Sequence, residues 1–525
     1  MLFEHLEISM SSTAIFVALL AALALSLIIR GYSTLPHIAG PPSPSWIFGN
    51  MMQLLLPPQL GDYEFAWRKL YGPVYKLKAC FGQDRLMVSD PIALQYILNS
   101  QDFDRGPVLA LLMDWFHGER AVIGRKGKDH RHLRAALNIG FTGAAVRQYH
   151  PVFEKVAHTI SEKLDHSNAV SIDMCPLLST AALDAISQVV LGYPLEDLGA
   201  DFVTSNLQVI NLTTTPSATQ ILADAIIPLF PLWLVHKAIY LPMKTFKLFR
   251  TNKYLANREG RRAVREKMEI ARQGLEPSND VFSLLLNLNQ PDDARKSLTE
   301  EDIVGQTTVL MLAGQETTAN TLAFGLVELA KNPELQETLR TEIHATLSTG
   351  GSNVAYDSMP LLNAFIKEAL RMFPALPFPE RKAVKDTVIP LSESIALKTG
   401  QRINQVPVHK GQTVFVGIAS YQQLESRWGD DAEKYRPSRW VDGTVSPGEG
   451  LGPYANLLTF LGGPHTCLGW RFAILEMQII VCELVGKFSF SLPVDHLYRS
   501  QFAGTMQPVD ADGKKSALLC VKRIM

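Results

Sequence analysis

One cysteine near the C-terminal end stands in a setting that suits metal ligation. Residues 460–469 read Phe-Leu-Gly-Gly-Pro-His-Thr-Cys-Leu-Gly, and an apolar, helix-like run over residues 470–480 follows directly. Glycines allow positive φ and let a flat ligand approach the backbone closely. A cysteine entering a helix N-terminus lies beside amide donors and the positive end of the helix dipole, which favour a thiolate. Cys467 therefore suits axial ligation of a haem iron, although a single cysteine is more often a small buried apolar side chain.

A second polar stretch interrupts the longest helical segment of the chain. Residues 298–331 predict one helix, which Thr299 caps and which ends at Asn332-Pro333. Inside it, residues 313–318 read Ala-Gly-Gln-Glu-Thr-Thr. Glycine in a helix interior costs roughly 1 kcal/mol relative to alanine, and a Glu-Thr-Thr run in an apolar helix is also unfavourable. Local rules that are broken together indicate a functional site; the alternative is a polar face packed on another helix.

Two further pairs of polar residues have helical spacing. Glu368 and Arg371 lie one turn apart between apolar residues, but the same spacing recurs elsewhere in the chain, and such pairs ordinarily decorate a solvated face. His130 and Arg134 stand four residues apart and share one helix face. On the residues alone, the second pair is best explained as a solvated basic face.

Together these stretches resemble the cytochrome P-450 superfamily of haem-thiolate monooxygenases, and most of all its fungal microsomal members. The resemblance implies that Cys467 is the iron ligand and that Phe460 packs beside it. It also implies that Gly463 and Gly469 make the turns that expose backbone amides to the sulfur. The fold it implies is mainly α with a small β-region, with a haem between the long helix and the cysteine loop.

The same resemblance assigns cationic or donating side chains to the haem propionates. His465 stands where most members of the superfamily carry arginine, and His130 replaces a tryptophan four residues before Arg134. An imidazole still donates one hydrogen bond, and beside carboxylates it can hold a proton. Arg381 matches a further position that often contacts a propionate, but no sharp motif surrounds it, and a surface arginine is the alternative.

For the remaining motifs the resemblance implies catalytic and structural roles. Thr317 is expected to supply a hydroxyl at the oxygen-binding groove, and Glu316 to supply protons. Glu368, Arg371 and Arg439 are expected to form a buried ion network that locks the domain core.

The N-terminal residues predict a membrane anchor. Residues 10–29 are uncharged and mostly apolar, long enough as a helix to cross a hydrocarbon core of about 30 Å. Glu4 and Glu7 precede this stretch and Arg30 follows it, so the charges favour a lumenal N-terminus and a cytosolic domain. A cleaved signal peptide, which begins with a basic region, is the rival interpretation.

We therefore expect three parts and a location at the endoplasmic reticulum membrane. Residues 1–30 form the single-pass anchor, residues 31–50 a proline-rich hinge, and residues 51–525 the catalytic domain. Within that domain, residues 71–78 and 86–90 predict paired strands and residues 91–98 a helix. Between about residue 130 and residue 375 the pattern is almost wholly helical.

Composition excludes several other classes of protein. The formal net charge is −1 and the sequence pI is about 6.9, which gives no electrostatic argument for nucleic-acid binding. The 5 cysteines are scattered and odd in number, which is typical of a reducing compartment rather than a disulfide framework.

The implied reaction inserts one oxygen atom of O2 into a hydrophobic small molecule, with haem b as cofactor. Because no fused reductase is evident, electrons would come from a separate NADPH-dependent flavoprotein reductase, docked on a basic surface. Apolar pocket candidates favour a hydrophobic substrate, and a terpenoid of fungal secondary metabolism is our leading expectation. The docking residues are Arg125, Lys126, Lys128 and Arg131, and the pocket candidates are Val108–Phe116, Ile210–Leu229, Val309, Leu312, Pro374–Phe378 and Phe502–Met506.

Three alternatives remain open at this level. A sterol, fatty-acid or xenobiotic hydroxylase of primary metabolism would share every motif. A thiolate-haem isomerase or dehydratase needs no reductase and often lacks the acid–alcohol pair, which this chain keeps as Glu316 and Thr317. A non-catalytic membrane haem-binding or lipid-binding protein would not need Cys467.

Overall fold

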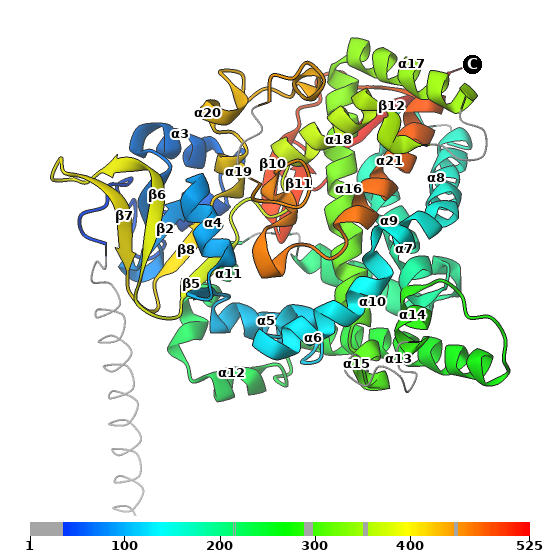
Figure 1. Ribbon diagram of the computed structural model, residues 1–525, viewed down its shortest axis with the longest axis horizontal. Coiled ribbons are helices and arrows are strands. Elements are labelled where there is room, and N and C mark those ends of the chain that lie inside the picture. Colours follow the sequence, from blue (N-terminus) through cyan, green and yellow to red (C-terminus); the bar gives the residue numbers. More distant parts are fainter. Residues whose placement is uncertain are drawn as a thin grey trace, which may run out of the picture.

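A computed structural model describes residues 35–167, 169–213, 215, 217–287, 298–349, 355–445 and 450–524. The predicted anchor at residues 1–30 lies outside the described residues. The part of the chain that is described is mostly helical, with a smaller β-rich region gathered on one side of it (Figure 1). The expected mainly α fold with a small β-region is therefore confirmed.

The centre of the helical part is α16 (Thr307–Lys331), most of whose side chains are buried. Around it pack α9 (Met174–Leu191), α18 (Pro360–Met372) and α21 (Trp470–Lys487), with α8 (His150–Asp165) against α9 and α21. Among the described residues, α9 is long and apolar enough to cross a membrane, but 72% of its apolar window is buried inside the protein. We interpret α9 as a core helix, because it packs along α16.

The other helices cover this centre or join it to the sheets. Within the described residues they are α2 (Met51–Leu55), α3 (Asp62–Tyr71), α4 (Pro91–Asn99), α5 (Pro107–His117), α6 (Gly127–Leu137), α7 (Gly143–Gln148), α10 (Ala200–Thr213), α11 (Ala218–Ile226), α12 (Leu232–Ala238), α13 (Lys244–Arg272), α14 (Val281–Asn287), α15 (Glu300–Val304), α17 (Pro333–Thr349), α19 (Ile418–Tyr421) and α20 (Glu425–Trp428).

The largest sheet has the strand order β1-β2-β8-β5-β3, in which β2 and β8 are parallel and the other pairs antiparallel. The predicted pairing of the first two strands is confirmed, although the first strand begins three residues later than expected because α3 runs to Tyr71. The strands of this sheet are β1 (Val74–Lys78), β2 (Asp84–Val88), β8 (Thr413–Val416), β5 (Glu380–Ala383) and β3 (Phe103–Asp104). Smaller sheets contain β6 (Thr387–Ala396) with β7 (Arg402–Val408), β10 (Arg499–Ala503) with β11 (Thr505–Val509), and β4 (Ile172–Asp173), β12 (Leu518–Arg523) and β9 (Phe488–Ser491).

The predicted single helix over residues 298–331 is wrong, because the structure divides it into α15 and α16. Thr299 caps α15 as expected, with a reciprocal hydrogen bond from its backbone to Asp302. The break lies at Gly305 and Gln306. The fully buried amide of Gln306 donates to the carbonyl of Arg120 at 2.8 Å and accepts the Val122 amide at 2.9 Å. A distant loop therefore takes up polar groups that a continuous helix would have left unpaired.

A buried ion network joins α18 to the segment that leads toward the cysteine loop. The Glu368 carboxylate accepts from Arg371 Nε at 2.9 Å and Nη2 at 2.8 Å, and from Arg439 Nε at 3.0 Å. It also accepts from the Arg436 amide and the Trp440 indole at 2.8 and 2.9 Å. The side chains of Glu368, Arg371 and Arg439 are at most 1% exposed. The structure thus brings together the three residues that the sequence singled out.

We predict that Arg371→Ala destabilises the fold by about 3–5 kcal/mol, because it leaves the Glu368 carboxylate buried with its charge uncompensated. Chemical denaturation measures this loss, and the porphyrin retained per purified chain reports its consequence for the site. Arg272→Ala is the matched control, since Glu269 and Arg272 have the same spacing but exposed side chains. Equal stability and porphyrin content in the two variants would contradict the assignment.

A second buried carboxyl, Glu64 on α3, faces α19. The Ser420 hydroxyl donates to its Oε1 at 2.7 Å, while Oε2 has no partner among the described residues. Burial raises the pKa of Glu64 from 4.5 to about 7, and the Ser420 hydrogen bonds and the charge of Arg68 offset only part of this effect. Between about pH 4.5 and pH 7, this carboxyl is therefore protonated in the folded protein and ionised in the unfolded chain.

We predict that Glu64→Gln makes the free energy of unfolding less dependent on pH. As the pH rises from the unfolded pKa of 4.5 to the folded value of about 7, the folded state holds the extra proton. The natural protein should therefore lose stability across this window, by about 3 kcal/mol in total, and the variant should not. Denaturant titrations at both ends of the window measure the difference. The exposed Glu393→Gln serves as control, and a parallel pH profile for Glu64→Gln and the natural protein would overturn the prediction.

Candidate functional site

The cysteine loop has a backbone that only particular residues allow. Phe460 is 8% exposed, and its carbonyl accepts the amide of Cys467 at 2.8 Å, which closes the loop. Gly463 has φ +65°, and a Cβ there would lie 2.3 Å from the carbonyl oxygen of Leu98. Glycine is therefore required at Gly463 both for its backbone angle and for the close approach of α4.

Gly469 has a different role from Gly463. It caps α21 with φ −89°, and a Cβ at this position would meet no atom closer than 3.9 Å. Its backbone hydrogen bond to Cys467 lowers the pKa of the thiol, as does the charge of Arg134. The Cys467 side chain reaches solvent, but desolvation by the atoms around it is the largest effect and still raises that pKa, so the protein alone favours the neutral thiol. A bound metal cation would reverse this preference, because it stabilises the thiolate directly.

Beside the loop lies a cleft of about 550 Å³ into which basic residues project. It is lined by His130, Arg131, Arg134, Ala135, Asn138, Gly463 and Pro464. The rings of His130 and His465 face each other with their centroids 4.5 Å apart. His130 and Arg134 lie on α6, and His465 lies more than 300 residues further along the chain. The structure brings these three residues together at one end of the loop.

Two more arginines complete this basic group. Arg381 on β5 is 5% exposed, and burial lowers its pKa to about 10, with a further contribution from the charge of Arg105. The surface-arginine alternative for Arg381 is thus wrong. Burial, followed by the nearby charges of Arg105, His130 and Arg381, lowers the pKa of His465 to about 3. Among the described residues, Asp104 is the carboxylate whose negative charge raises the pKa values of His465 and Arg381. Asp104 itself forms an ion pair with Lys126 at 2.6 Å.

This surplus of buried positive charge fits a ligand with two carboxylates. The buried Nδ1 of His465 has no hydrogen-bond partner among the described residues, and a buried polar atom ordinarily has one. The propionates of a haem would supply both the missing acceptor and the missing negative charge, while the Cys467 thiolate would hold the iron. The residues present therefore fit a haem.

On α16, the two candidate catalytic side chains point in different directions. The hydroxyl of Thr317 donates to the carbonyl of Ala313 at 2.9 Å, and Ala313 itself is exposed. The carboxylate of Glu316 is buried, accepts from the Ser179 hydroxyl at 2.5 Å and forms an ion pair with Lys515. Because successive helical residues point about 100° apart, the acid is held away from the face of Thr317.

A chain of amide side chains supports the Glu316 carboxylate. Gln315 Nε2 donates to Ser179 Oγ at 3.0 Å, and its Oε1 accepts from Asn206 Nδ2 at 2.8 Å. Both amides are buried. This network joins α9, α10 and α16, so the acid has a fixed orientation.

Sequence reasoning missed Arg105, Ser179 and Lys515. Arg105 stands alone between β3 and α5, in a stretch without a recognisable motif. Lys515 lies 199 residues from Glu316, and Ser179 lies 137 residues from it. No local spacing could reveal these contacts, because they depend on the packing of α9, α16 and the chain before β12.

The predicted pocket residues divide between two apolar clusters and the core. Leu312 on α16 packs, with Leu112, Phe116 and Ile227, against a cluster formed by α5, α10, α12 and α13. Val309 belongs instead to the main helical core. A second cluster holds Ile221, Phe378 and Met506, with Phe502 packed against Phe378 at a centroid distance of 5.3 Å. Apolar side chains from widely separated segments therefore meet near α16.

Comparison with known proteins identifies the family. A family profile described as Cytochrome P450 matches residues 39–508. Cytochrome P450 monooxygenase 91 of Postia placenta is 29% identical in an alignment of 526 positions, gaps included, that covers 94% of this chain and 95% of that protein. Cytochrome P450 monooxygenase 219 of the same fungus is 30% identical, with 87% and 88% covered. Ganoderic acid synthetase of Ganoderma lucidum is 28% identical, with 93% of each chain covered.

The profile spans the cysteine loop, the basic cleft, α16 and the ion network in one continuous match. A family of this kind uses a haem and O2 together with electrons from a redox partner. The chain therefore belongs to the cytochrome P450 family, and it is an oxidoreductase of the monooxygenase class.

Proposed function

We propose that this enzyme hydroxylates a hydrophobic small molecule, a terpenoid of fungal secondary metabolism, with electrons from a separate NADPH-dependent flavoprotein reductase. The observation that carries the proposal is the meeting of the Cys467 loop with a buried basic group that fits haem propionates. Haem b is the haem that we propose, and it supplies the activation of dioxygen when it is bound. The name of the relative ganoderic acid synthetase favours a terpenoid.

The side chains of the protein supply orientation and protons. Phe460 and the Gly463 turn hold the ligand cysteine, Arg134 and Arg381 balance the negative charge of the cofactor, and His130 and His465 offer it hydrogen bonds. The apolar cluster against Leu312 excludes water and favours an apolar substrate. Thr317 offers a hydroxyl on the same helix. Glu316 is turned toward Ser179 and Lys515, so its proton supply to Thr317 would have to pass through intervening water.

We also propose that the enzyme lies on the endoplasmic reticulum membrane, with a single-pass anchor and its catalytic domain in the cytosol. Exposed apolar side chains around α12 support the membrane contact, because tryptophan and tyrosine are typical of membrane interfaces. They are Phe230, Leu232, Trp233, Leu234, Tyr240, Leu241 and Met243, of which Trp233 is 64% and Tyr240 75% exposed.

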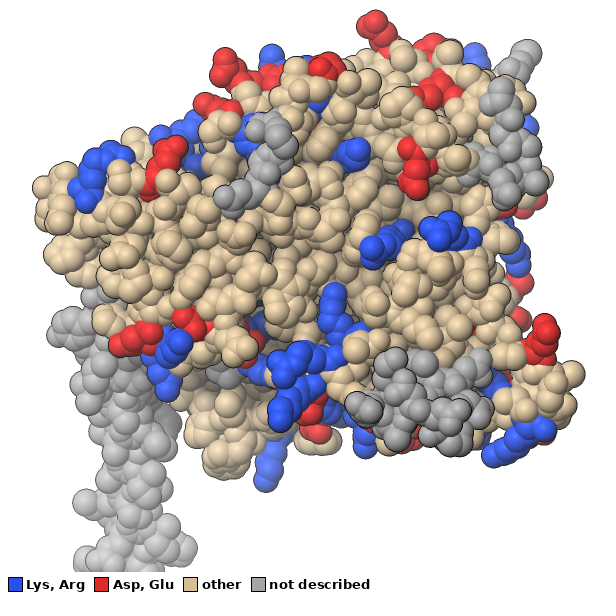
Figure 2. All heavy atoms as spheres, in the orientation of Figure 1, with Lys and Arg blue, Asp and Glu red and all other residues tan. Residues whose placement is uncertain are grey.

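The reductase is expected to dock on basic residues at the start of α6. Lys126, Lys128 and Arg131 are exposed there and Arg125 is partly exposed, and Figure 2 shows lysine and arginine side chains gathered over this part of the molecule. An acidic partner would be attracted to this surface. This expectation agrees with the use of a redox partner by the family.

The function is tested with the purified full chain, an NADPH-dependent reductase and candidate terpenoids under labelled dioxygen. We expect a product that is heavier by one labelled oxygen atom and that requires NADPH. Conversion of a pre-oxidised substrate in the absence of NADPH and reductase would instead show an isomerase or dehydratase. Labelled products from sterols or fatty acids alone would move the enzyme to primary metabolism.

The orientation of Glu316 generates a separate prediction. Glu316→Gln removes the proton donor and should lower the rate of product formation by about 10²-fold or more. Lys515→Met removes the cation that holds this acid, so we expect a smaller share of the consumed NADPH to appear as product and more to appear as hydrogen peroxide. Lys514→Met, at an exposed neighbouring position, is the matched control. If Lys515→Met and Lys514→Met couple NADPH to product equally well, the ion pair with Glu316 has no role in catalysis.

A further inference from the structure

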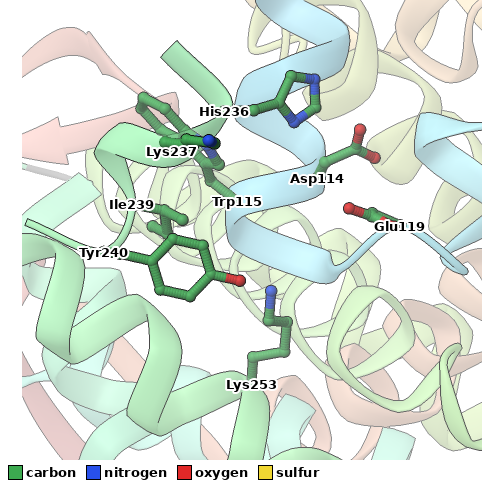
Figure 3. Close-up of a pocket in the computed structure, with 8 residues that line it drawn as sticks. All are labelled: Asp114, Trp115, Glu119, His236, Lys237, Ile239, Tyr240 and Lys253. Atoms are coloured by element: carbon green, nitrogen blue, oxygen red, sulfur yellow. The ribbon is translucent and has the colours of Figure 1, made fainter. Parts of the chain in front are cut away.

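A second pocket lies between α5, α12 and α13, apart from the basic cleft. Its volume is about 160 Å³, which suits a small head group and is too small for a polycyclic substrate. It is lined by Asp114, Trp115, Glu119, His236, Lys237, Ile239, Tyr240 and Lys253. Figure 3 shows the carboxylates of Asp114 and Glu119 on one side of the opening, with the Lys253 ammonium and the Tyr240 hydroxyl across from them.

The charged groups of this pocket act on one another electrostatically, but not at ion-pair distance. The structure places no ion-pair partner within 4.0 Å of Asp114, Glu119 or Lys253 among the described residues. Burial is the largest cause of the raised pKa of Asp114 and of the lowered pKa of Lys253, and the opposite charges already present offset it only in part. These charges are His236, Arg125 and Lys253 for Asp114, and Glu119 and Asp114 for Lys253. The indole Nε1 of Trp115, a residue only 6% exposed, also has no acceptor among the described residues. The pocket thus presents separated donors, acceptors and charges of both signs.

The mixture of positive and negative side chains in this pocket limits which ligands can bind there. The lining carries two carboxylates, two lysines and His236, so a ligand of a single charge sign would meet groups of its own sign as well as groups of the opposite sign. A divalent metal ion does not fit either, because the described residues contain no group of three side chains able to hold one. A dipolar ligand, positive at one end and negative at the other, satisfies both sides of the pocket.

The surroundings indicate where such a ligand would come from. Trp233, Leu234, Leu241 and Met243 are exposed beside the pocket on α12 and the residues that follow it. A diacyl lipid could lay its chains along this apolar surface while its head group enters the pocket. Aromatic residues with a polar tip, such as Tyr240, are typical of the boundary between apolar chains and head groups.

We propose that the pocket between α5, α12 and α13 binds the head group of a zwitterionic phospholipid, phosphatidylethanolamine. The ammonium would lie between Asp114 and Glu119, and the phosphate would accept hydrogen bonds from Lys253 and Tyr240, which lie together across the opening (Figure 3). This inference rests on the proposed membrane association of the enzyme. It adds that a particular lipid is bound at α5, a helix whose Leu112 and Phe116 pack with Leu312 of α16.

The test uses the full chain in detergent and short-chain dihexanoyl phosphatidylethanolamine below its micellar concentration, with binding measured by calorimetry. We expect saturable binding that is weakened at least about tenfold by Lys253→Met and by Asp114→Asn. Lys247→Met, exposed on the same helix, is the control. Dihexanoyl phosphatidylglycerol, which lacks the ammonium, should bind no better than the variants bind phosphatidylethanolamine.

Equal binding of the two lipids, or binding that both pocket variants leave unchanged, would overturn the proposal. The folding of each variant is checked by thermal unfolding and by its retained porphyrin, and Glu119→Gln provides a milder change in the same pocket. Sedimentation with phosphatidylethanolamine vesicles tests membrane association separately from head-group binding. Head-group binding without vesicle binding would contradict the membrane association alone, whereas vesicle binding without head-group binding would contradict the pocket alone.

Discussion

The buried carboxylate of Glu368 is the constraint on which the rest of the site depends. It accepts hydrogen bonds from two arginines, an indole and a backbone amide while it is fully shielded from water. A charge in such a place is tolerated only when every partner is present. The network therefore fixes the end of α18 against the segment around Arg439 with little freedom.

Hydrogen bonds connect the end of α18 to the start of the cysteine loop. Thr459, which directly precedes Phe460, donates to the carbonyl of Leu370 at 2.6 Å and to Gln422 at 3.1 Å. Gln422 in turn donates to the carbonyl of Arg371 at 2.8 Å. The entrance of the loop is thus tied to the same helix turn as the ion network, while α21 carries its exit. The position of Cys467 therefore depends on the buried ion network around Glu368, although that network does not contact the cysteine itself.

Sequence patterns located the parts of the site that depend on local spacing. The cysteine loop, the Glu368–Arg371 turn and the Gly314–Thr317 stretch can each be recognised from a motif of a few consecutive residues. Lys515 and Arg105 do not, because their importance comes only from packing with segments far along the chain. The break between α15 and α16 has the same origin, since Gln306 forms its hydrogen bonds to a loop that is 184 and 186 residues distant. Tertiary contacts overrode an otherwise continuous helical pattern.

We expect the sulfur of Cys467 to bind the iron of a haem that the basic cleft holds. The most direct measurement is the Soret band of the reduced, carbon monoxide-bound full chain, recorded beside the Cys467→Ser variant. Thiolate ligation predicts a strongly red-shifted band in the natural protein and its complete loss in the variant. A natural protein with the band of a histidine-ligated haem, or a serine variant that keeps the red-shifted band, would contradict the account.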